Sequence, residues 1–438
     1  MTAGESTSGA PTAASGGSGL PPRPRPHSIA PGRLTVEDHL ETILRGIGPL
    51  GAYDQPVVES LGLSLHEEIV SDLDLPRHDS ADIDGYAVAA QDLAGASTTG
   101  PVELPVVGEI VSGSGKPFAI SSGTCVTIMT GAPLPHGADA VVPVEHVRGD
   151  HARVGFTRPA TPGQNVRRQG EDVQAGTLVL PEGSVLGPRE IGLLASVGRS
   201  RIKARPRPRV VIISTGRELR EPGEHLGHDS VYDGNSSMIA AAVRAAGAIA
   251  FRVGAVGDDP RQFQRVLSDQ LVRADLVITT GGLGHSRRDV VRQVLGNVGT
   301  VQFHDVALEP GHDQGFGRVL DEETPLIALP GDPVSAFVAF EVFALPALRR
   351  LMGRTPYRRP QVHAVLAEDI ASEPGQREYV RGIFEVTHRG AKVTPVKGRG
   401  AHLIGHLAQA NALIVVGEDE TALNLGDTVR TIVLDRSF

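Results

Sequence analysis

The chain has 438 residues, enough for several domains, and its net charge of −9 excludes broad electrostatic binding to nucleic acid, because such binding depends on clustered Lys and Arg. No apolar run is long enough to span a membrane and no basic-then-apolar signal pattern is present, so no transmembrane segment is expected. The single cysteine, Cys125, cannot form an internal disulfide, which fits a reducing, cytoplasmic location.

The N-terminal segment 1–33 consists mostly of small residues and proline. Such a composition cannot bury enough apolar surface to offset its ordering entropy, so we predict a disordered tail. A helix is predicted next, over 35–47, with Thr35 as its cap. Its apolar residues share one face, which indicates a core or dimer contact: Val36, Leu40, Ile43, Leu44 and Ile47.

The next part of the chain is predicted to hold a small β-domain inserted between two flanking segments. Short strands alternate with Gly and Pro turns over 76–164. The flanking stretches, 34–75 and 165–205, are predicted to form N-terminal, dimerisation segments. A helical pattern returns at 184–198, and the proline-spaced basic segment 203–209 is expected to be a stiff connector.

Buried apolar strands alternate with amphipathic helices over 206–353. This alternation predicts an α/β domain with a mostly parallel sheet that helices cover on both faces. Residues 354–438 show short alternating strands separated by Gly and Asp turns, which predict a small C-terminal β-barrel or sandwich.

Three loops of the α/β domain follow strands and combine small residues with polar groups: 214–219, 279–289 and 329–335. Ligands of parallel sheets sit beyond the carboxyl ends of strands, where backbone N–H groups can hold anions. Any one loop alone is explained as a simple connection, but three together favour a phosphate-bearing ligand. The candidate binding residues on these loops are Thr215, Gly216, Gly281, Gly282, Arg287, Arg288, Gly331 and Ser335.

Carboxylates near these loops suggest a cation site. Asp258 precedes a predicted helix, where capping is the simpler explanation. Glu218 and Asp289 lie on the ligand loops, and carboxylates beside a bound phosphate are how proteins hold Mg²⁺. The acidic run 75–88 and the Arg-rich run 166–172 either border a cleft or form ordinary surface turns and ion pairs.

Taken in chain order, several stretches resemble the molybdopterin molybdenumtransferase family, which comprises the MoeA proteins and the homologous gephyrin E domain. The resemblance runs from about residue 35 to the C-terminus. It is carried by "DLPRHDSADIDGYAV", "IMTGAPLPHGADAVVPVEHV", "VRRQGEDVQAGTLVLPEGS", "STGRELREPGE", "VYDGN", "GDDP", "TTGGLG" with a following Asp, and "LPGDPVSAF".

The resemblance implies an elongated homodimer of multidomain protomers, with an α/β domain similar to molybdopterin-binding proteins. It also implies an enzyme that takes adenylylated molybdopterin, a pterin, and molybdate, and releases AMP with the help of Mg²⁺ or Zn²⁺. Catalytic roles are implied for Asp84, Thr130, Asp172, Glu218, Asp258 and Asp289, the cation site for Glu218, Asp258 and Asp289, and ligand binding for Arg167, Pro330 and Pro333.

The chain departs from the family pattern in its charges. Asp305 and Glu309 stand where the family is often basic, and His312 stands where it has a lysine. Arginines stand where relatives are acidic or neutral, which suggests that positive charge has moved within the site: Arg217, Arg287 and Arg288.

The departures leave a second hypothesis beside the enzyme. A catalytically degenerate, gephyrin-like scaffold would bind a peptide tail of a cytoskeletal, division or membrane-receptor protein. The lost lysines favour the scaffold, whereas the retained carboxylates favour the enzyme, which we place first.

Overall fold

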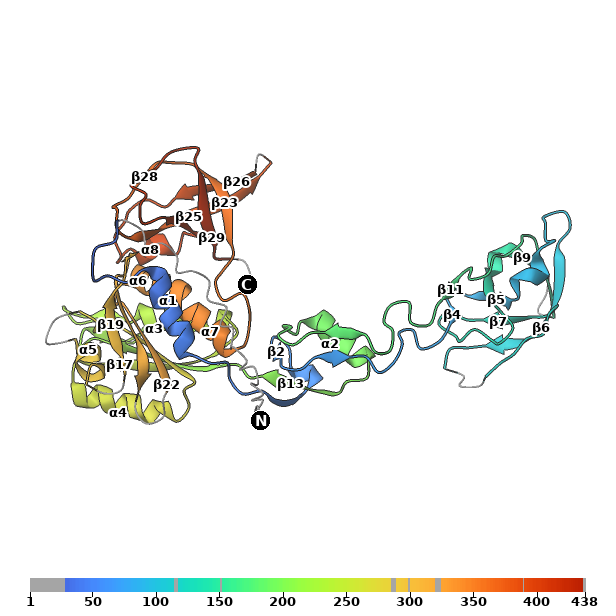
Figure 1. Cartoon of the computed structure of the whole chain (residues 1–438), viewed down its shortest axis with the longest axis horizontal. Helices are drawn as coiled ribbons and strands as arrows, with labels where there is room; N and C mark the ends of the chain where they lie inside the picture. The colour runs from blue at the N-terminus through green and yellow to red at the C-terminus, as the bar shows by residue number, and fades with distance from the viewer. Residues whose placement is uncertain are drawn as a thin grey trace, which may run out of the picture.

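The chain folds into an elongated molecule. The computed structural model describes residues 28–113, 117–149, 152–284, 289–297, 300–319, 324–388 and 390–435. An α/β domain and a C-terminal barrel lie at one end, a small β-domain at the other, and a central module between them (Figure 1). Most of the predicted N-terminal tail, residues 1–27, lies outside the described residues.

The sheet of the α/β domain has the strand order β17-β14-β18-β22-β21-β19. Its first four strands run parallel to one another, and β21 runs antiparallel to both of its neighbours, β22 and β19. Their bounds are β14 Arg209–Thr215, β17 Ile249–Val256, β18 Leu276–Thr280, β19 Gln302–Asp305, β21 Asp313–Val319 and β22 Thr324–Leu329. The mostly parallel sheet is confirmed, and the antiparallel pair β19–β21 is an element that the alternation of strands and helices does not predict.

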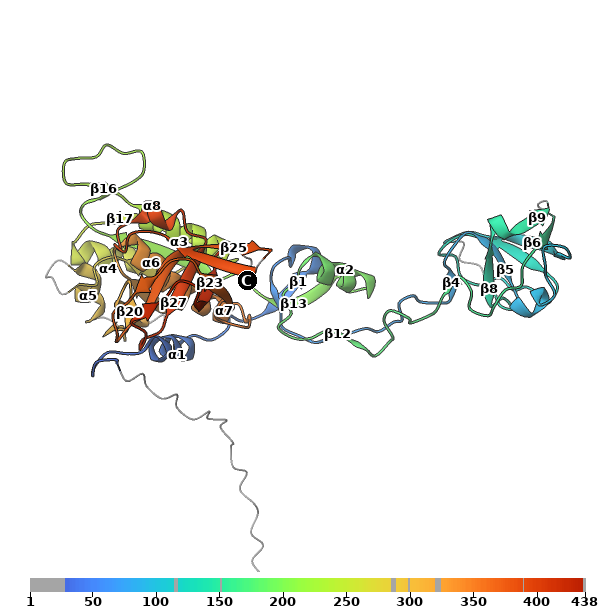
Figure 2. The ribbon, with the colours of Figure 1, turned by 90° about the horizontal axis from the view of Figure 1, so that it is seen from above.

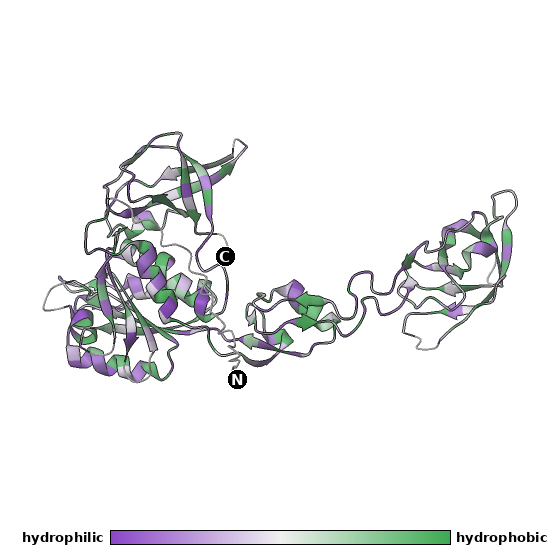
Figure 3. Ribbon diagram, in the orientation of Figure 1, coloured by the Kyte–Doolittle hydropathy of each residue, from purple (hydrophilic) through white to green (hydrophobic). Residues whose placement is uncertain are grey.

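Helices cover both faces of this sheet, because alternate residues of the buried strands point to opposite sides. Val210 and Ile212 share a core with α3, α6 and α7, whereas Val211 and Ile213 share another with α4 and α5. Hydrophilic residues recur along α4 (Figure 3). The bounds are α3 Gly234–Ala245, α4 Pro260–Leu271, α5 Val290–Leu295, α6 Pro333–Ala339, η4 Phe340–Ala344 and α7 Leu345–Leu351, with η4 a π-helical turn.

Helix α1, Val36–Gly46, packs into the core of the α/β domain. Its cap is Thr35, whose side-chain oxygen accepts a hydrogen bond from the Asp38 amide at 2.9 Å. The sequence groups this helix with segment 34–75, but its apolar face is completed by the α/β core instead. The fully buried Ile43 therefore belongs with the sheet rather than with the central module.

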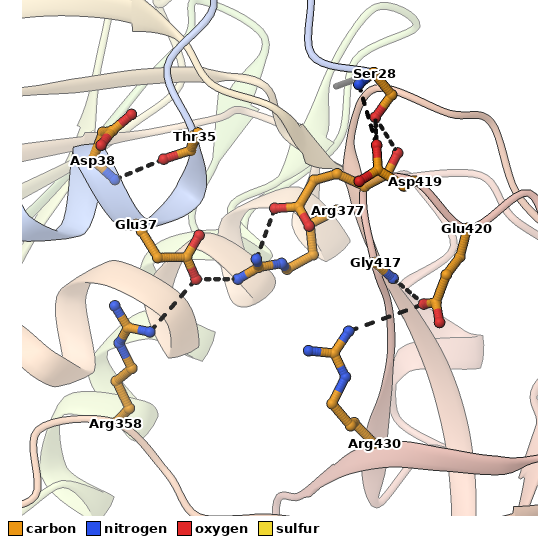
Figure 4. Close-up of polar contacts among 11 residues, drawn as sticks. Ser28, Thr35, Glu37, Asp38, Arg358, Arg377, Gly417, Asp419, Glu420 and Arg430 are labelled. Carbon is orange, nitrogen blue, oxygen red and sulfur yellow. Dashed lines mark hydrogen bonds and ion pairs between the residues drawn. The ribbon is translucent and has the colours of Figure 1, made fainter. Parts of the chain in front are cut away.

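A cluster of charged side chains ties α1 to the C-terminal barrel (Figure 4). Arg377 forms ion pairs with Glu37 of α1 and with Glu418, the latter at 2.7 Å. Arg358 lies 3.6 Å from Glu37. Burial opposes ionisation of Glu37, but the hydrogen bond and charge of Arg377 outweigh it and hold the pKa of Glu37 below its usual value. The N-terminal helix is thus held electrostatically by the last domain of the chain.

The central module joins the two ends of the molecule. Its elements enclose one small apolar cluster that includes Leu65, Leu186 and Leu194. The bounds are β1 Tyr53–Pro56, η1 Val57–Glu59, β2 Ser64–Leu65, β3 Ile69–Val70, β12 Leu178–Leu180, α2 Pro188–Ser196 and β13 Arg201–Arg205.

The distal domain, which contains β4 to β11, is the inserted small β-domain. Its sheet has the order β8-β5-β7-β6-β10-β9, with an apolar cluster on each side. The bounds are β4 Ser80–Ala81, β5 Gly85–Val88, η2 Ala90–Leu93, β6 Val102–Ile110, β7 Cys125–Ile128, β8 Ala140–Pro143, η3 Val144–His146, β9 Val147–Gly149, β10 Arg153–Phe156 and β11 Val166–Arg167.

The C-terminal domain is a closed five-stranded β-barrel, because the pairing of β25 with β27 completes the circuit β25-β26-β23-β29-β27. Strand β20, Leu308–Glu309, leaves the α/β domain and pairs with β25. The bounds are β23 Gln361–Leu366, β24 Ile370–Ala371, β25 Arg377–Thr387, β26 Gly390–Pro395, α8 Ile404–Leu407, β27 Ala412–Val416, β28 Ala422–Leu423 and β29 Thr428–Val433. None of the described helices combines the length and apolar character that crossing a membrane requires.

Candidate functional site

A cavity of about 740 Å³ opens at the carboxyl ends of the parallel strands, where the α/β domain meets β20 and α8. All three loops singled out in the sequence contribute to its wall. The predicted site residues that line it are Thr215, Glu218, Gly281, Gly282, Asp289, Pro330, Gly331, Pro333 and Ser335. The base of the loop between β15, Leu219–Arg220, and β16, Val231–Tyr232, also lines it, and Figure 2 shows that loop reaching outwards from the domain.

Glycines let the loop after β18 approach the loop after β14. Gly281 has φ of 88°, and a Cβ atom there would lie 2.7 Å from the carbonyl oxygen of Thr215. A Cβ on Gly282 would lie 3.0 Å from Thr215 Oγ1. Neither position accommodates a larger residue, so the backbone itself forms this part of the wall.

Hydrogen bonds fix the loops after β18 and β22 to each other. Thr280 Oγ1 donates to the Pro330 carbonyl at 2.8 Å, and Asn235 Nδ2 donates to Thr280 Oγ1 at 3.0 Å and to the Gly331 carbonyl at 2.6 Å. The loops are therefore ordered by the protein before any ligand binds. Asn235 lies in the "VYDGN" stretch, but nothing in the sequence shows that its amide spans two loops.

Two of the three predicted cation ligands, Glu218 and Asp289, line the cavity, whereas Asp258 does not. Within the described part of the chain, no group of three or more His, Cys, Asp or Glu side chains is placed to hold a metal ion. The buried carboxylate of Asp233 is occupied by Ser214 Oγ and by the Ser236 amide, each at 3.0 Å, so it caps α3.

The described lining of the cavity contains no Lys or Arg. It carries one histidine, His312, and six carboxylates: Glu218, Asp233, Asp289, Glu309, Asp313 and Asp332. Arg217, expected to supply positive charge, is exposed and does not line the cavity, whereas the next residue, Glu218, does. Arg287 and Arg288 lie outside the described residues.

Asp305 and Glu309, where the family resemblance leads us to expect basic residues, have different surroundings. Asp305 is paired with Arg33 at 2.9 Å and is not part of the cavity lining. Glu309 does line the cavity, and burial, reinforced by the charge of Glu378, raises its pKa above the usual value.

Of the other predicted site residues, Gly216 is buried and is not part of the lining. Asp84, Thr130 and Arg167 belong to the distal domain, at the opposite end of the molecule from the cavity (Figure 1), and Asp172 lies in the segment that leaves that domain. Asp84 accepts hydrogen bonds from the Thr130 amide at 2.7 Å and from Thr130 Oγ1 at 2.8 Å, and these bonds lower the pKa of Asp84. Arg167 pairs with Asp82 at 2.7 Å, and Asp172 is exposed. One protomer therefore does not bring these residues to the cavity.

Family models match three successive parts of the chain. A model described as the MoeA N-terminal region, domains I and II, matches residues 34–198. A probable molybdopterin binding domain matches 211–350, and the MoeA C-terminal region, domain IV, matches 363–434.

Curated relatives and solved structures match over nearly the full length. Molybdopterin molybdenumtransferase 2 of Mycobacterium tuberculosis is 40% identical over 398 residues, which cover 90% of this chain and 97% of the relative. The molybdopterin molybdenumtransferase of Haemophilus influenzae is 33% identical over 83% of this chain and 89% of its own length. A crystal structure of a molybdopterin biosynthesis MoeA protein from Pyrococcus horikosii has a TM-score of 0.80 and 29% identity, and covers 92% of this chain and 100% of its own.

Proposed function

Because the chain belongs to the molybdopterin molybdenumtransferase family, we propose that it acts in molybdenum cofactor biosynthesis, inserting molybdate into adenylylated molybdopterin and releasing AMP. The observation that carries this proposal is the convergence of three loops, each following a parallel strand, on one cavity. Its volume suits a nucleotide-sized ligand.

The backbone of the glycine loops would hold the anionic part of the substrate. Gly281, Gly282 and Gly331 present main-chain atoms at the wall, and side chains larger than hydrogen would fill the first two positions. The buried hydroxyl oxygen of Thr215 has no hydrogen-bond partner among the described residues, so it is free to contact a ligand. Pro330, Pro333 and Ser335 would close the same side of the cavity.

A divalent cation, Mg²⁺ or Zn²⁺, fits the carboxylates on two of these loops. Glu218 and Asp289 line the cavity on separate loops, and Mg²⁺ is bound by one or two carboxylates together with substrate phosphates. When bound, the ion would neutralise charge at the pyrophosphate and polarise the bond that is hydrolysed. Asp258 lies beyond the lining, so the proposed cation site rests on Glu218 and Asp289.

A homodimer would bring the distal residues to the cavity. The central module exposes apolar side chains, which is typical of a surface that contacts a partner: Tyr53, Val58, Leu61, Leu178 and Val185. A second copy docked there would supply Asp84, Thr130, Arg167 and Asp172, which one protomer keeps apart from its own cavity. The polar pairs of the distal domain would then orient the substrate from the opposite side.

The scaffold alternative, with a peptide as its partner, is not favoured. The curated relatives are named as transferases, and the loops that form the cavity carry glycines and the two carboxylates proposed to bind the cation. A protein kept solely for peptide binding has no need of an ordered, ligand-sized cavity of this kind.

The proposal is tested by incubating purified protein with adenylylated molybdopterin, MgCl₂ and molybdate, and measuring AMP. We expect AMP release that requires both the cation and molybdate. The variants Glu218→Gln and Asp289→Asn should each raise the Mg²⁺ concentration needed for half-maximal release by about tenfold or more, since each removes a charged ligand.

The matched control is Asp332→Asn, which also removes one carboxylate from the cavity wall but none from the proposed cation site. Its Mg²⁺ requirement should stay close to that of the wild type. If the folded protein releases no AMP under any combination of cation and molybdate, the enzymatic proposal is wrong.

A further inference from the structure

Glu309 occupies an unusual place at the boundary of two domains. It lines the main cavity beside His312, and together with Pro310 it also lines a second cavity of about 200 Å³ between the α/β domain and the barrel. It is half-buried.

The pairing of β20 with β25 places two glutamates side by side. Glu309 is the register partner of Glu378 in this parallel pair, and partners of adjacent strands project to the same face of a sheet. Glu378 already has partners: Ser372 Oγ donates to it at 2.7 Å, and Arg399 lies 3.2 Å away. The carboxyl oxygens of Glu378 are thus occupied by contacts within the barrel.

Glu309 has no comparable partner. No described side chain or backbone group donates a hydrogen bond to its carboxyl oxygens, and it forms no ion pair with the described residues. Burial raises its pKa most, followed by the negative charges of Glu378 and Glu373, while His312 and Arg33 act in the opposite direction. The cations of the second cavity, Arg381, Lys397 and Arg399, also face this region.

We propose that Glu309 binds the anionic substrate as a neutral carboxylic acid and donates its proton in a hydrogen bond to a phosphate oxygen of that substrate. This inference rests on the proposed function, because it takes the occupant of the cavity to be a phosphate-bearing anion. A neutral acid is a hydrogen-bond donor, whereas an ionised carboxylate accepts only and repels an anion. The protonated glutamate thus supplies a hydrogen-bond donor in a wall whose described lining contains no Lys or Arg.

The proposal gives this chain a distinctive response to pH. Substrate binding to the protonated form is favoured below the pKa of Glu309 and weakens as pH rises through it, by up to about tenfold per unit. His312 lines the same cavity, so its contribution is separated from that of Glu309 by substitution.

The test measures the affinity of the intact protein for adenylylated molybdopterin by calorimetry, without Mg²⁺ or molybdate, across the pH range. Proton uptake is obtained by repeating the titration in buffers of different ionisation enthalpy. We expect Glu309→Gln, a permanently neutral donor, to keep the low-pH affinity of the wild type within about threefold and to lose most of the proton uptake. His312→Gln should retain the uptake that belongs to Glu309.

Two results would overturn the proposal. The first is a proton uptake in Glu309→Gln equal to that of the wild type. The second is an affinity of Glu309→Gln at least about tenfold weaker than that of the wild type at every pH, as expected if an ionised carboxylate were needed. A ligand-free measurement separates this inference from the proposed function. The melting temperatures of wild type and Glu309→Gln should agree near pH 4 and diverge as pH rises above the ordinary glutamate pKa, 4.5, with the wild type less stable.

If the melting temperatures diverge in this way but no ligand binds at any pH, the proposed substrate is wrong while the protonated glutamate stands. If they stay parallel, Glu309 is an ordinary ionised glutamate and the inference fails, whatever the protein binds.

Discussion

Individual side chains give the cavity an acidic character that is unexpected for a site meant to hold a pterin nucleotide. Its described lining has several carboxylates and one histidine. In the proposed function, the charge of the ligand is balanced by backbone N–H groups, by the proposed cation at Glu218 and Asp289, and by neighbouring residues of the loops. Gly284 and Asp289 both line the cavity, and the stretch between them contains Arg287 and Arg288. Both arginines lie outside the described residues, so their supply of positive charge to the site stays a prediction from the sequence.

The substitution Arg288→Glu tests this charge balance. We expect the affinity for adenylylated molybdopterin to fall by about tenfold or more, or roughly 1.4 kcal/mol, because the residue that precedes the lining residue Asp289 in the sequence changes from a cation to an anion. Calorimetric titration at constant pH measures the change. Arg217→Glu is the matched control, since Arg217 is exposed and outside the lining, and it should leave affinity nearly unchanged. If the two variants weaken binding equally, Arg288 contributes no more to ligand affinity than the exposed Arg217 does.

At this scale the sequence identifies residues whose role follows from their own backbone and misses those whose role depends on neighbours. Gly281 and Gly282 are predictable because a tight loop after a buried strand requires them. The bridging amide of Asn235 is not, because its partners are the Thr280 hydroxyl and a carbonyl nearly a hundred residues away. Glu218 lines the cavity and its neighbour Arg217 does not, and no residue pattern specifies which of the two does so.

The positions of helices and strands along the chain are easier to predict from the sequence than the way these elements pack against one another. The strands of the parallel sheet carry continuous apolar runs and the helices carry apolar stripes, so local patterning suffices for both. The placement of α1 against the sheet requires knowledge of which apolar face completes the core. The antiparallel strand β21 has glycines at 315 and 317, which weaken its strand signal, although Phe303 and Val301 pack against them.

The ion pairs of Arg377 give α1 a testable dependence on the barrel. Arg377→Met would leave Glu418, 7% exposed, without its cation and would remove the shorter of two ion pairs from Glu37. We expect a loss of about 3 kcal/mol in the local stability of α1, because an uncompensated buried charge is costly. Hydrogen exchange of α1 peptides, followed by mass spectrometry, measures this as a fall in protection of about a hundredfold.

The dependence on pH has a defined sign. The pKa of Glu37 is depressed, so its contribution to stability is present above the ordinary value of 4.5 and is lost as pH falls below it. The difference between Arg377→Met and the wild type should therefore shrink in acid. Arg430→Met serves as the control, since its exposed pair with Glu420, at 4.0 Å, should contribute less than about 0.5 kcal/mol. If both variants lose similar stability, the ion pairs of Arg377 stabilise α1 no more than an exposed ion pair does.

The whole molecule separates residues that the family resemblance assigns to one site. The cavity lies in the α/β domain, whereas Asp84 and Thr130 lie in the distal domain, beyond the central module (Figure 1). Sequence order could predict the separate domains, because each has its own pattern of strands and turns. It could not predict their spatial separation, since the direction of the two connecting segments depends on tertiary packing.

The central claim is that the cavity is the reaction site and that the distal residues of a second copy complete it. The most direct test mixes two variants, Asp84→Asn and Glu218→Gln, after reversible subunit dissociation, and measures AMP release from adenylylated molybdopterin with Mg²⁺ and molybdate. At a Mg²⁺ concentration that supports the wild type but is limiting for Glu218→Gln, each variant alone should have low activity. A mixed dimer would contain one intact site and one doubly altered site, so an equal mixture should recover about a quarter of wild-type activity. A mixture that forms mixed dimers yet stays as inactive as its components would contradict the account.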